Sequence, residues 1–494
     1  MSVKAIEGLA PAQVWNRFFE ISQIPRPSKH EERIRLYLRN FAGQNSIEMS
    51  EDATGNIVMK IPPKPGFEKT PVVVLQSHVD MVCEKNKDKV HDFLHDPIEL
   101  VRDGNWIKAD ETTLGADNGI GVAAALAIAT DDTFEHGPIE LLFTVDEETG
   151  LTGAHTLTKG FIEGKYLLNL DTEEDGYYYV GCAGGMDTIG TFEIEFERIK
   201  EGYQAYTLFI SGLKGGHSGV NIHEGRANAI KIIGLLLDKL STTDFQIAML
   251  TGGSKRNAIP REAETIIYLN PDTEAAIREI LNEFTIETIL EYKDTDPTIK
   301  ITLDKKDDSE FQKVYTREFS KKIINVILSL PNGVISMHPK ISGLVETSTN
   351  LATVVVEQNH APVSKMMIGT SQRSSIESAK KNIASSVRAV FELADAEITN
   401  TDGYPGWQPD LDSKLLKISQ KVHKQLFNRE AELKAVHAGL ECGILSDKYP
   451  GIEMISFGPT IEGAHSPDER IKITDVEKFY RLLKSLITEI AKAK

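Results

Sequence analysis

The sequence predicts an α/β protein in which a mostly parallel sheet flanked by helices is interrupted by a large α+β insert. Short apolar runs that end in polar residues alternate with helical segments over residues 1–186, as in parallel sheets with helical crossovers. From about residue 187, strands and amphipathic helices alternate as in antiparallel α+β layers, and the first pattern returns near residue 399. We therefore expect one domain built from residues 1–186 and 399–494, and an inserted domain of two α+β halves over 187–398.

Size and composition are those of a globular protein with more than one domain. The 494 residues are too many for one simple core, and 40% hydrophobic with 26% charged residues is ordinary. A net charge of −18 argues against a nucleic-acid partner. The sequence shows no apolar leader and no run of ~20 apolar residues, so we expect no membrane partner and a cytoplasmic location. Three separated cysteines, Cys83, Cys182 and Cys442, fit a reducing compartment.

Two helices and a hairpin are expected before the first buried strand. Residues 11–22 have helical apolar spacing and begin with a proline. Ser28 and Glu31 have the spacing of a capping box, which predicts the start of a second helix. Residues 52–56 form a predicted hairpin turn that leads into a strand over 57–61.

A buried strand over residues 72–78 ends in His78, and Asp80 follows two positions later. Residues i and i+2 of extended backbone point to the same side, so both side chains project beyond the carboxyl end of the strand, where open α/β sheets bind ligands. A carboxylate in this position commonly orients a metal-bound imidazole. An alanine-rich helix is expected over 120–129, and Asp117 precedes it; an ordinary N-cap is the alternative to a functional role.

Three more strands carry polar groups at their ends: 138–145 before Glu147 and Glu148, 167–170 before Asp171, and 452–457, which continues to His465. Imidazole and carboxylate ligands without thiolates suit zinc, manganese or cobalt, and two ions fit the number of ligands better than one. Adjacent residues of an extended segment face opposite ways, so one of Glu147 and Glu148 is free to act as a general base.

The remaining elements are predicted from the same patterns. In the insert we expect strands over 191–196, 205–210, 266–269 and 299–303 and helices over 227–240 and 311–330. They suggest a β-α-β-β unit that occurs twice, without a clear sequence repeat. After residue 399 we expect a helix over 411–426, strands over 431–436 and 452–457, and a last helix from residue 474.

Six motifs together resemble the di-zinc metallopeptidases that include carnosinases, tripeptidases and amino-acid deacylases. They are His78-Val-Asp80, Leu114-Gly-Ala-Asp117-Asn-Gly, Asp146-Glu147-Glu148-Thr-Gly, Asn169-Leu-Asp171, Gly215-Gly-His217-Ser-Gly and Gly463-Ala-His465-Ser-Pro. Within this group, Asn257-Ala-Ile-Pro-Arg-Glu-Ala and His437-Ala-Gly-Leu-Glu-Cys-Gly are most similar to the bacterial aminoacyl-histidine dipeptidases. The motifs occur in order along nearly the whole chain, which makes the resemblance specific.

The resemblance implies a zinc-exopeptidase-like catalytic domain with an inserted lid, two Zn²⁺ ions as cofactors and a role for each residue of the motifs. His78 and Asp171 would bind one ion, Glu148 and His465 the other, Asp117 would bridge them, Asp80 would orient His78, and Glu147 would be the general base. Mn²⁺ or Co²⁺ would suit the same ligands. Family members also tend to have a cis peptide after the bridging aspartate, here between Asp117 and Asn118.

In the insert, the resemblance implies that His217 contacts the oxyanion and that Arg373 binds the terminal carboxylate of a substrate, with Asn257 and Asn350 as further substrate-binding candidates. From the residues alone, His217 is equally a turn histidine with a local hydrogen bond, and Arg373 a solvated charge at a strand end. Glu441 would support the metal ligands or cap a helix, and the sequence does not separate these two roles.

The implied activity is the hydrolysis of dipeptides, Xaa-His and other unblocked ones, by a metal-activated water. A deacylase of N-acyl amino acids is the first alternative, because water activation would be identical. A catalytically inactive zinc-binding relative is the second, and the complete ligand set with Glu147 argues against it. The insert is long enough to complete the site within one chain, and a homodimer through the insert is the alternative assembly.

Overall fold

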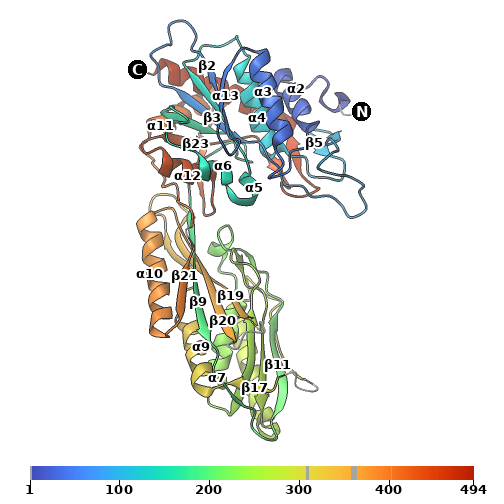
Figure 1. Ribbon diagram of the computed structural model, residues 1–494, viewed down its shortest axis with the longest axis vertical. Helices are drawn as coiled ribbons and strands as arrows, with labels where there is room; N and C mark the ends of the chain where they lie inside the picture. Colours follow the sequence, from blue (N-terminus) through green and yellow to red (C-terminus); the bar gives the residue numbers. More distant parts are fainter. Residues whose placement is uncertain (1–2, 307–310, 358–363, 402, 494) are drawn as a thin grey trace. The chain divides into compact units, whose positions relative to one another are not determined.

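The computed structural model describes residues 3–306, 311–357, 364–401 and 403–493. They form two compact units: unit 1 comprises Met1–Gly181, Trp407–Ala435 and Leu440–Lys494, and unit 2 comprises Cys182–Gly406 and Val436–Gly439. Each unit combines helices with its own sheet, which confirms the predicted mixed α/β class (Figure 1). The segment expected to form an insert lies within unit 2.

Unit 1 is built on an eight-stranded sheet. Its strand order is β1 (Glu48–Glu51), β2 (Ile57–Ile61), β6 (Ile139–Thr144), β3 (Val73–His78), β7 (Tyr166–Asn169), β23 (Glu453–Ser456), β8 (Tyr177–Cys182) and β22 (Glu432–Val436). The four central strands β6, β3, β7 and β23 run parallel to one another, and β1 and β2 are antiparallel. Four carboxyl ends therefore lie at the same edge of the sheet, where polar side chains were predicted to gather.

The central strands are buried because helices flank the sheet. Every residue of β3, β6 and β7 is buried, as expected for continuous apolar runs. Helix α4 (Ala116–Ala129) packs on β3 and against α2 (Ala12–Ser22), and α11 (Lys414–Phe427) packs on β23 and against α13 (Ile473–Lys492). Figure 1 shows α2, α4 and α3 (Glu32–Gln44) grouped beside the sheet. A smaller sheet of four strands has the order β24 (Ile461–Glu462), β25 (Arg470–Lys472), β5 (Trp106–Ala109) and β4 (Leu100–Asp103).

The predicted hairpin turn is confirmed, and the predicted capping box is wrong. Asp52 Oδ1 accepts hydrogen bonds from three backbone N–H groups of the turn. Helix α3 begins at Glu32, but Ser28 Oγ donates to Asp80 at 2.8 Å, and Glu31 Oε1 accepts from the N–H of Asp146 at 3.0 Å. Ser28 therefore bonds to a distant part of unit 1 instead of the helix start, whereas Glu31 Oε1 also accepts the nearby N–H of Lys29 at 2.8 Å.

Unit 2 contains a nine-stranded sheet whose strand pairings are antiparallel, which confirms the predicted α+β character. The path of the sheet is β16 (Lys300–Lys305), β11 (Gln204–Ser211), β15 (Ala263–Leu269), β13 (Phe245–Gly252), β19 (Val345–Glu357), β20 (Lys365–Ser374), β9 (Gly184–Glu193) and β21 (Glu397–Asn400), and β18 (Gly333–Met337) pairs with β19. Helices α7 (Ala229–Leu240), α9 (Arg317–Ser329) and α10 (Glu377–Leu393) pack on it (Figure 1). Their apolar faces form one buried core with the sheet.

Several boundaries in unit 2 differ from the prediction. The helix expected over 311–330 is shorter, because β17 (Lys313–Tyr315) precedes it and Thr316 caps α9 by accepting the N–H of Phe319. The strand expected over 191–196 is divided between β9 and β10 (Phe196–Arg198). Helices α8 (Glu274–Glu291) and α10 were not predicted.

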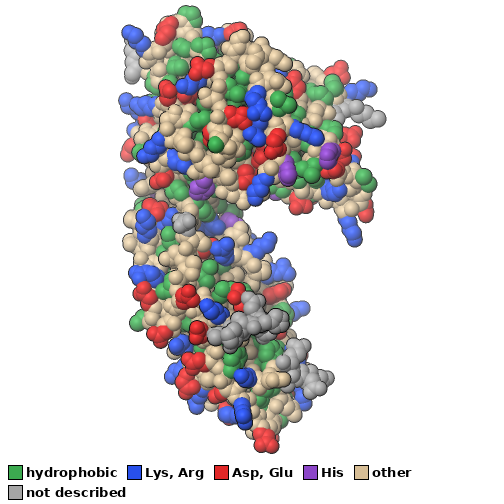
Figure 2. All heavy atoms as spheres, viewed as in Figure 1, with side chains coloured by type: hydrophobic (Ala, Val, Ile, Leu, Met, Phe, Trp, Pro, Cys, Tyr) green, Lys and Arg blue, Asp and Glu red, His purple; other side chains and the backbone are tan. Residues whose placement is uncertain are grey.

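The surface agrees with the acidic composition. On the face drawn in Figure 2, acidic and basic side chains of the described residues are interspersed, without a continuous basic patch. Every helix in the described part of the chain is too short or too polar to traverse a bilayer.

Candidate metal centre

His78 is the last residue of β3, and its imidazole meets two carboxylates at the functional edge of the unit 1 sheet. His78 Nε2 lies 3.0 Å from Asp117 Oδ1 and 3.3 Å from Asp171 Oδ1. Ligand atoms bound tetrahedrally to one Zn²⁺ at its usual bond lengths lie roughly 3.3 Å apart. The three side chains therefore have the spacing of ligands to one cation.

A second group of three ligands adjoins the first. His465 Nε2 lies 3.2 Å from Asp117 Oδ2 and 3.1 Å from Glu148 Oε2. Asp117 thus places one carboxylate oxygen beside each histidine, which is the position required of a bridge between two cations.

His465 reaches this place by a route that differs from the prediction. Strand β23 ends at Ser456, and the chain then enters the four-stranded sheet as β24. His465 lies in the loop between β24 and β25 with a φ of 62°, so it does not continue the parallel strand. The prediction that His465 follows the end of the last parallel strand is therefore wrong, and its family motif is independent of that setting.

Glu147 and Glu148 begin a short helix, α5 (Glu147–Gly150), instead of extending β6 as predicted. Asp80 Oδ1 accepts the N–H of Glu147 at 3.1 Å, and Asp80 Oδ2 accepts the N–H of Glu148 at 3.2 Å. The carboxyl group of Glu148 lies beside His465, and the carboxyl group of Glu147 lies near His78. Ligand atoms of His78, Glu147 and Glu148 lie within 4.8 Å of one another, so both carboxyl groups face the site.

Asp80 connects this helix to the first histidine. Its Oδ1 lies 3.3 Å from His78 Nδ1, on the side of the ring opposite Asp117. Burial alone would raise the pKa of Asp80, but hydrogen bonds from His78, Ser28 and Glu147 lower it to about 2. Asp80 is therefore ionised at neutral pH and orients the imidazole so that Nε2 faces the carboxylates.

Asp117 does not act as an N-cap, so that alternative is wrong. Its backbone is non-helical, with φ −78° and ψ 114°, and its carboxyl group faces the two histidines. Glu469 binds the buried start of α4 instead, accepting the N–H groups of Leu114, Gly115, Ala116 and Asp117. The peptide between Asp117 and Asn118 is cis, as the family resemblance implied. Sequence analysis missed Glu469, which has no distinctive local motif.

The site carries a surplus of negative charge that divalent cations would offset. Burial and neighbouring carboxylates raise the pKa of Asp171 to about 7 and that of Glu173 to about 8, and they raise the pKa of Glu147 well above its usual range. Glu148 Oε1 and Glu441 Oε1 are buried without a hydrogen-bond partner in the described part of the chain. Unpaired buried carboxylate oxygens beside two imidazoles fit a two-metal centre.

Glu441 supports the strand ends, and its side chain does not cap the helix that it begins, α12 (Glu441–Lys448). Glu441 Oε2 accepts hydrogen bonds from Gln76 Nε2 at 2.6 Å and from Thr144 Oγ1 at 2.7 Å. Gln76 in turn accepts a hydrogen bond from Asn169. Because these residues belong to β3, β6 and β7, the network joins the three strands just below the ligands.

In unit 2, His217 ends the short strand β12 (Gly216–His217). His217 Nδ1 accepts the N–H groups of Gly219 at 3.2 Å and Val220 at 3.1 Å, so the ring hydrogen is on Nε2. Burial and the charge of Arg373 lower the pKa of His217 to about 4. His217 therefore has the local hydrogen bonds of a turn histidine and, as a neutral ring at pH 7, keeps Nε2–H as a donor.

Arg373 lies on β20 and is only 6% exposed, so its interpretation as a solvated charge is wrong. Its guanidinium donates to Tyr404 Oη at 2.7 Å and to Ser218 Oγ at 3.4 Å. Asn350 is buried and donates to the carbonyl of Ala258, whereas Asn257 is exposed and its carbonyl accepts the N–H of Ser218. Sequence analysis missed Tyr404, which occurs in a Gly-Tyr-Pro-Gly segment typical of a turn.

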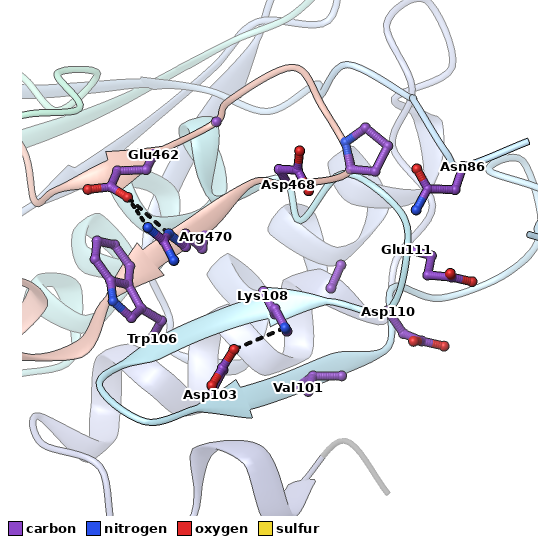
Figure 3. A pocket seen from close by; sticks show the side chains of 13 residues that line it. Asn86, Val101, Asp103, Trp106, Lys108, Asp110, Glu111, Glu462, Asp468 and Arg470 are labelled. Atoms are coloured by element: carbon purple, nitrogen blue, oxygen red, sulfur yellow. Dashed lines mark hydrogen bonds and ion pairs between the residues drawn. The ribbon is translucent and has the colours of Figure 1, made fainter.

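A cavity of about 690 Å³ in unit 1 is separate from this site (Figure 3). It lies between the β4–β5 hairpin and the β24–β25 segment, and its walls carry the ion pairs Arg470–Glu462 and Lys108–Asp103. Its lining includes no predicted site residue, although Gly463 and Pro467 flank the loop that holds His465.

Two histidines around a shared carboxylate, at the carboxyl edge of a parallel sheet, are the arrangement of a two-metal hydrolase. The chain belongs to the peptidase family M20/M25/M40, whose family model matches residues 74–489. It is 38% identical over 484 residues to the cytosol non-specific dipeptidase of Escherichia coli (strain K12), a match that covers 98% of both chains.

Solved structures agree with this family assignment. The crystal structure of aminoacylhistidine dipeptidase from Vibrio alginolyticus matches with a TM-score of 0.90 and 40% identity over 98% of each chain. A tripeptidase structure from Staphylococcus aureus matches with a TM-score of 0.60 and 17% identity, over 98% of this chain and 100% of that one, and shows the shared fold. The family predicted from the motifs is therefore confirmed.

Proposed function

We propose that this protein is a metal-dependent dipeptidase that hydrolyses unblocked dipeptides, Xaa-His among them. The single observation that carries the proposal is Asp117, whose two oxygens lie 3.0 Å and 3.2 Å from the imidazoles of His78 and His465. The dipeptidase names of two relatives that match over 98% of the chain support the substrate class.

The proposed cofactors are two Zn²⁺ ions. His78 and Asp171 would hold one ion, Glu148 and His465 the other, and Asp117 both. When bound, such ions polarise a substrate carbonyl and lower the pKa of a water that they share. The fit rests on the spacing of the ligand atoms and on the buried, unpaired oxygen of Glu148.

Glu147 is the proposed general base. It takes a proton from the attacking water and returns it to the nitrogen of the leaving amine. Asp80 positions this residue, because its carboxylate holds the first two N–H groups of α5, and the same carboxylate orients His78. Asp80 therefore positions both Glu147, the proposed general base, and His78, a proposed metal ligand.

Unit 2 supplies the proposed contacts to the substrate. His217 Nε2–H donates to the oxygen of the reacting carbonyl as negative charge develops there. Arg373 binds the terminal carboxylate, for which a planar guanidinium is suited. Asn257 and Asn350 are further candidates, and Asn350 keeps a buried Oδ1 without a hydrogen-bond partner in the described part of the chain.

We also propose that one chain supplies every residue of the site and that the enzyme works in the cytosol. A homodimer through unit 2 that exchanges His217 between chains is the alternative. Mixing the His217→Ala and Glu147→Ala variants tests this, because recovered activity would show that the site is shared. The three cysteines, which form no disulfide in the described part of the chain, and the word cytosol in a relative's name support the compartment.

The central experiment is metal analysis of the purified protein together with a substrate panel. We expect about two metal ions per chain, cleavage of dipeptides varied at each end, and little hydrolysis of N-acetylated amino acids. Preferred hydrolysis of the acetylated compounds would establish the deacylase instead. A fully metal-loaded protein that cleaves neither class would contradict both assignments.

A further inference from the structure

Arg373 is a buried cation without a counter-ion. It is only 6% exposed, and no carboxylate of the described residues lies within ion-pair distance of its guanidinium. A buried charge without a partner costs stability, so an arginine in this state marks a place where an anion from a ligand belongs. The proposed function assigns that anion to the terminal carboxylate of the dipeptide.

Tyr404 is a hydrogen-bond partner of this guanidinium, and its hydroxyl group can also act as a donor. Arg373 Nη1 donates to Tyr404 Oη at 2.7 Å, so the phenol oxygen acts as an acceptor in this contact. The phenolic hydrogen has no acceptor in the described part of unit 2. Burial raises the pKa of Tyr404, which keeps this hydrogen in place at neutral pH. An O–H donor therefore stands directly beside the unpaired guanidinium.

The phenol is held in a fixed position. The backbone N–H and carbonyl of Tyr404 both pair with Gly185, at 2.9 Å and 3.1 Å, and Lys380 Nζ also donates to the carbonyl at 2.7 Å. The ring lies against Gly185 and Gly439, where an added Cβ would come within 2.7 Å and 2.8 Å of ring atoms. Because neither glycine has a side chain, the ring fits against both positions.

Asp187, an acidic residue that raises the pKa of Tyr404, does not accept the phenolic hydrogen of Tyr404. The carboxylate of Asp187 is paired with Arg256 at 3.0 Å. Tyr404 itself is partly exposed.

We propose that Tyr404 is a specificity-determining residue that donates its phenolic hydrogen to one oxygen of the substrate's terminal carboxylate while Arg373 binds the same group. This inference rests on the proposed dipeptidase function and deepens it. Two neighbouring donors match a group with two acceptor oxygens, whereas a terminal carboxamide offers only one acceptor and carries no charge. The pair therefore selects dipeptides with a free carboxyl end.

The test compares the wild type with Tyr404→Phe on alanyl-histidine and on its C-terminal amide, using the full-length, metal-loaded enzyme. Phenylalanine keeps the ring in its slot and removes only the hydroxyl. We expect KM for alanyl-histidine to rise about tenfold to a hundredfold with kcat nearly unchanged, because a hydrogen bond to a charged group is lost. KM for the amide should stay within about twofold, so the preference for the free acid falls.

Tyr206→Phe is the matched control. It removes another phenol of unit 2, which donates to Glu274 at 2.6 Å, and it should leave the preference unchanged. Thermal unfolding of each variant checks that the fold is intact. If Tyr404→Phe alters both substrates equally, or neither, the inference is wrong. If the wild type cleaves no dipeptide at all, the proposed function fails first, which is a distinguishable result.

Discussion

The polar centres of the two units have opposite charge imbalances. In unit 1, carboxylates crowd around two histidines, and burial with mutual repulsion raises the pKa of Asp171 and Glu441 to about 7. In unit 2, the buried guanidinium of Arg373 has no acidic partner among the described residues, and burial together with its charge lowers the pKa of His217 to about 4.

The two imbalances agree with the ligands that we propose for each centre. Buried groups without a counter-charge are unfavourable by themselves, and their presence in both units is expected where ligands supply the missing charge. The carboxylates around His78 and His465 would be offset by a divalent metal pair, and the guanidinium of Arg373 by a dipeptide carboxylate. Changes at the first centre should therefore alter metal binding or chemistry, and changes at Arg373 should alter substrate affinity.

The largest expected effect follows from replacing Glu147, the proposed general base in unit 1. Glu147→Gln should lower kcat by about 10³- to 10⁴-fold, because the attacking water loses its proton acceptor. The metal content should stay at the wild-type value, since Glu148 and the other ligands are intact. Steady-state kinetics with metal analysis by mass spectrometry measure both quantities. Glu163→Gln, at a carboxylate that pairs with Lys60 on the surface, is the control. A near-native kcat would remove Glu147 from the mechanism.

The next effect separates the two groups of metal ligands. His465→Ala removes one imidazole of the second group and leaves the first group, His78 with Asp117 and Asp171, complete. We expect the protein to lose about one of two metal ions and to fall at least a hundredfold in activity. Metal analysis after dialysis measures the stoichiometry, with His95→Ala as an exposed-histidine control. Retention of both ions would show that His465 is not a ligand.

A change in unit 2 should produce the opposite pattern. Arg373→Ala should raise KM for a free dipeptide about tenfold to a hundredfold, because the charged partner of the carboxylate is gone, and should leave the metal content unchanged. Arg388→Ala, at an exposed arginine of the same unit that pairs with Glu392, serves as the control. Loss of metal from the Arg373→Ala variant would contradict the proposal that metal binding depends on residues of unit 1 alone.

The strand ends explain why so much of unit 1 could be predicted. His78 and Asp171 end strands whose burial and apolar runs are visible in the sequence, and parallel strands bring their carboxyl ends to one edge. His465 was also predicted to follow a parallel strand, and this was wrong, since its loop lies between strands of a different sheet; only its motif remains as correct evidence for it. Periodicity thus places ligands that follow a strand, and it does not place those on a loop.

Other parts of the site depend on contacts between distant segments. Ser28 and Glu31 have the spacing of a capping box, but each bonds to a residue far along the chain, Asp80 and Asp146. Glu469 binds the start of α4 across more than 350 residues of sequence. Local sequence patterns predict which hydrogen bonds a side chain can form, but the bonds that it does form depend on residues that the fold brings close to it.

The smallest expected effect is a pH-dependent change in stability caused by His437, which lies near the buried charge of Arg373. His437 is buried, its Nε2 lies 2.7 Å from Ser348 Oγ, and burial with the nearby charge of Arg373 lowers its pKa to about 3. An unfolded chain binds a proton at this residue below about pH 6.5, whereas the folded chain does not, so this contribution to stability is complete above pH 6.5 and is lost as the pH falls toward 3. Denaturant unfolding of metal-depleted protein at pH 7 and pH 5 should therefore show a larger loss of stability for the wild type than for His437→Gln. Equal losses would mean that His437 takes up its proton in the folded state, and that the charge of Arg373 does not extend to it.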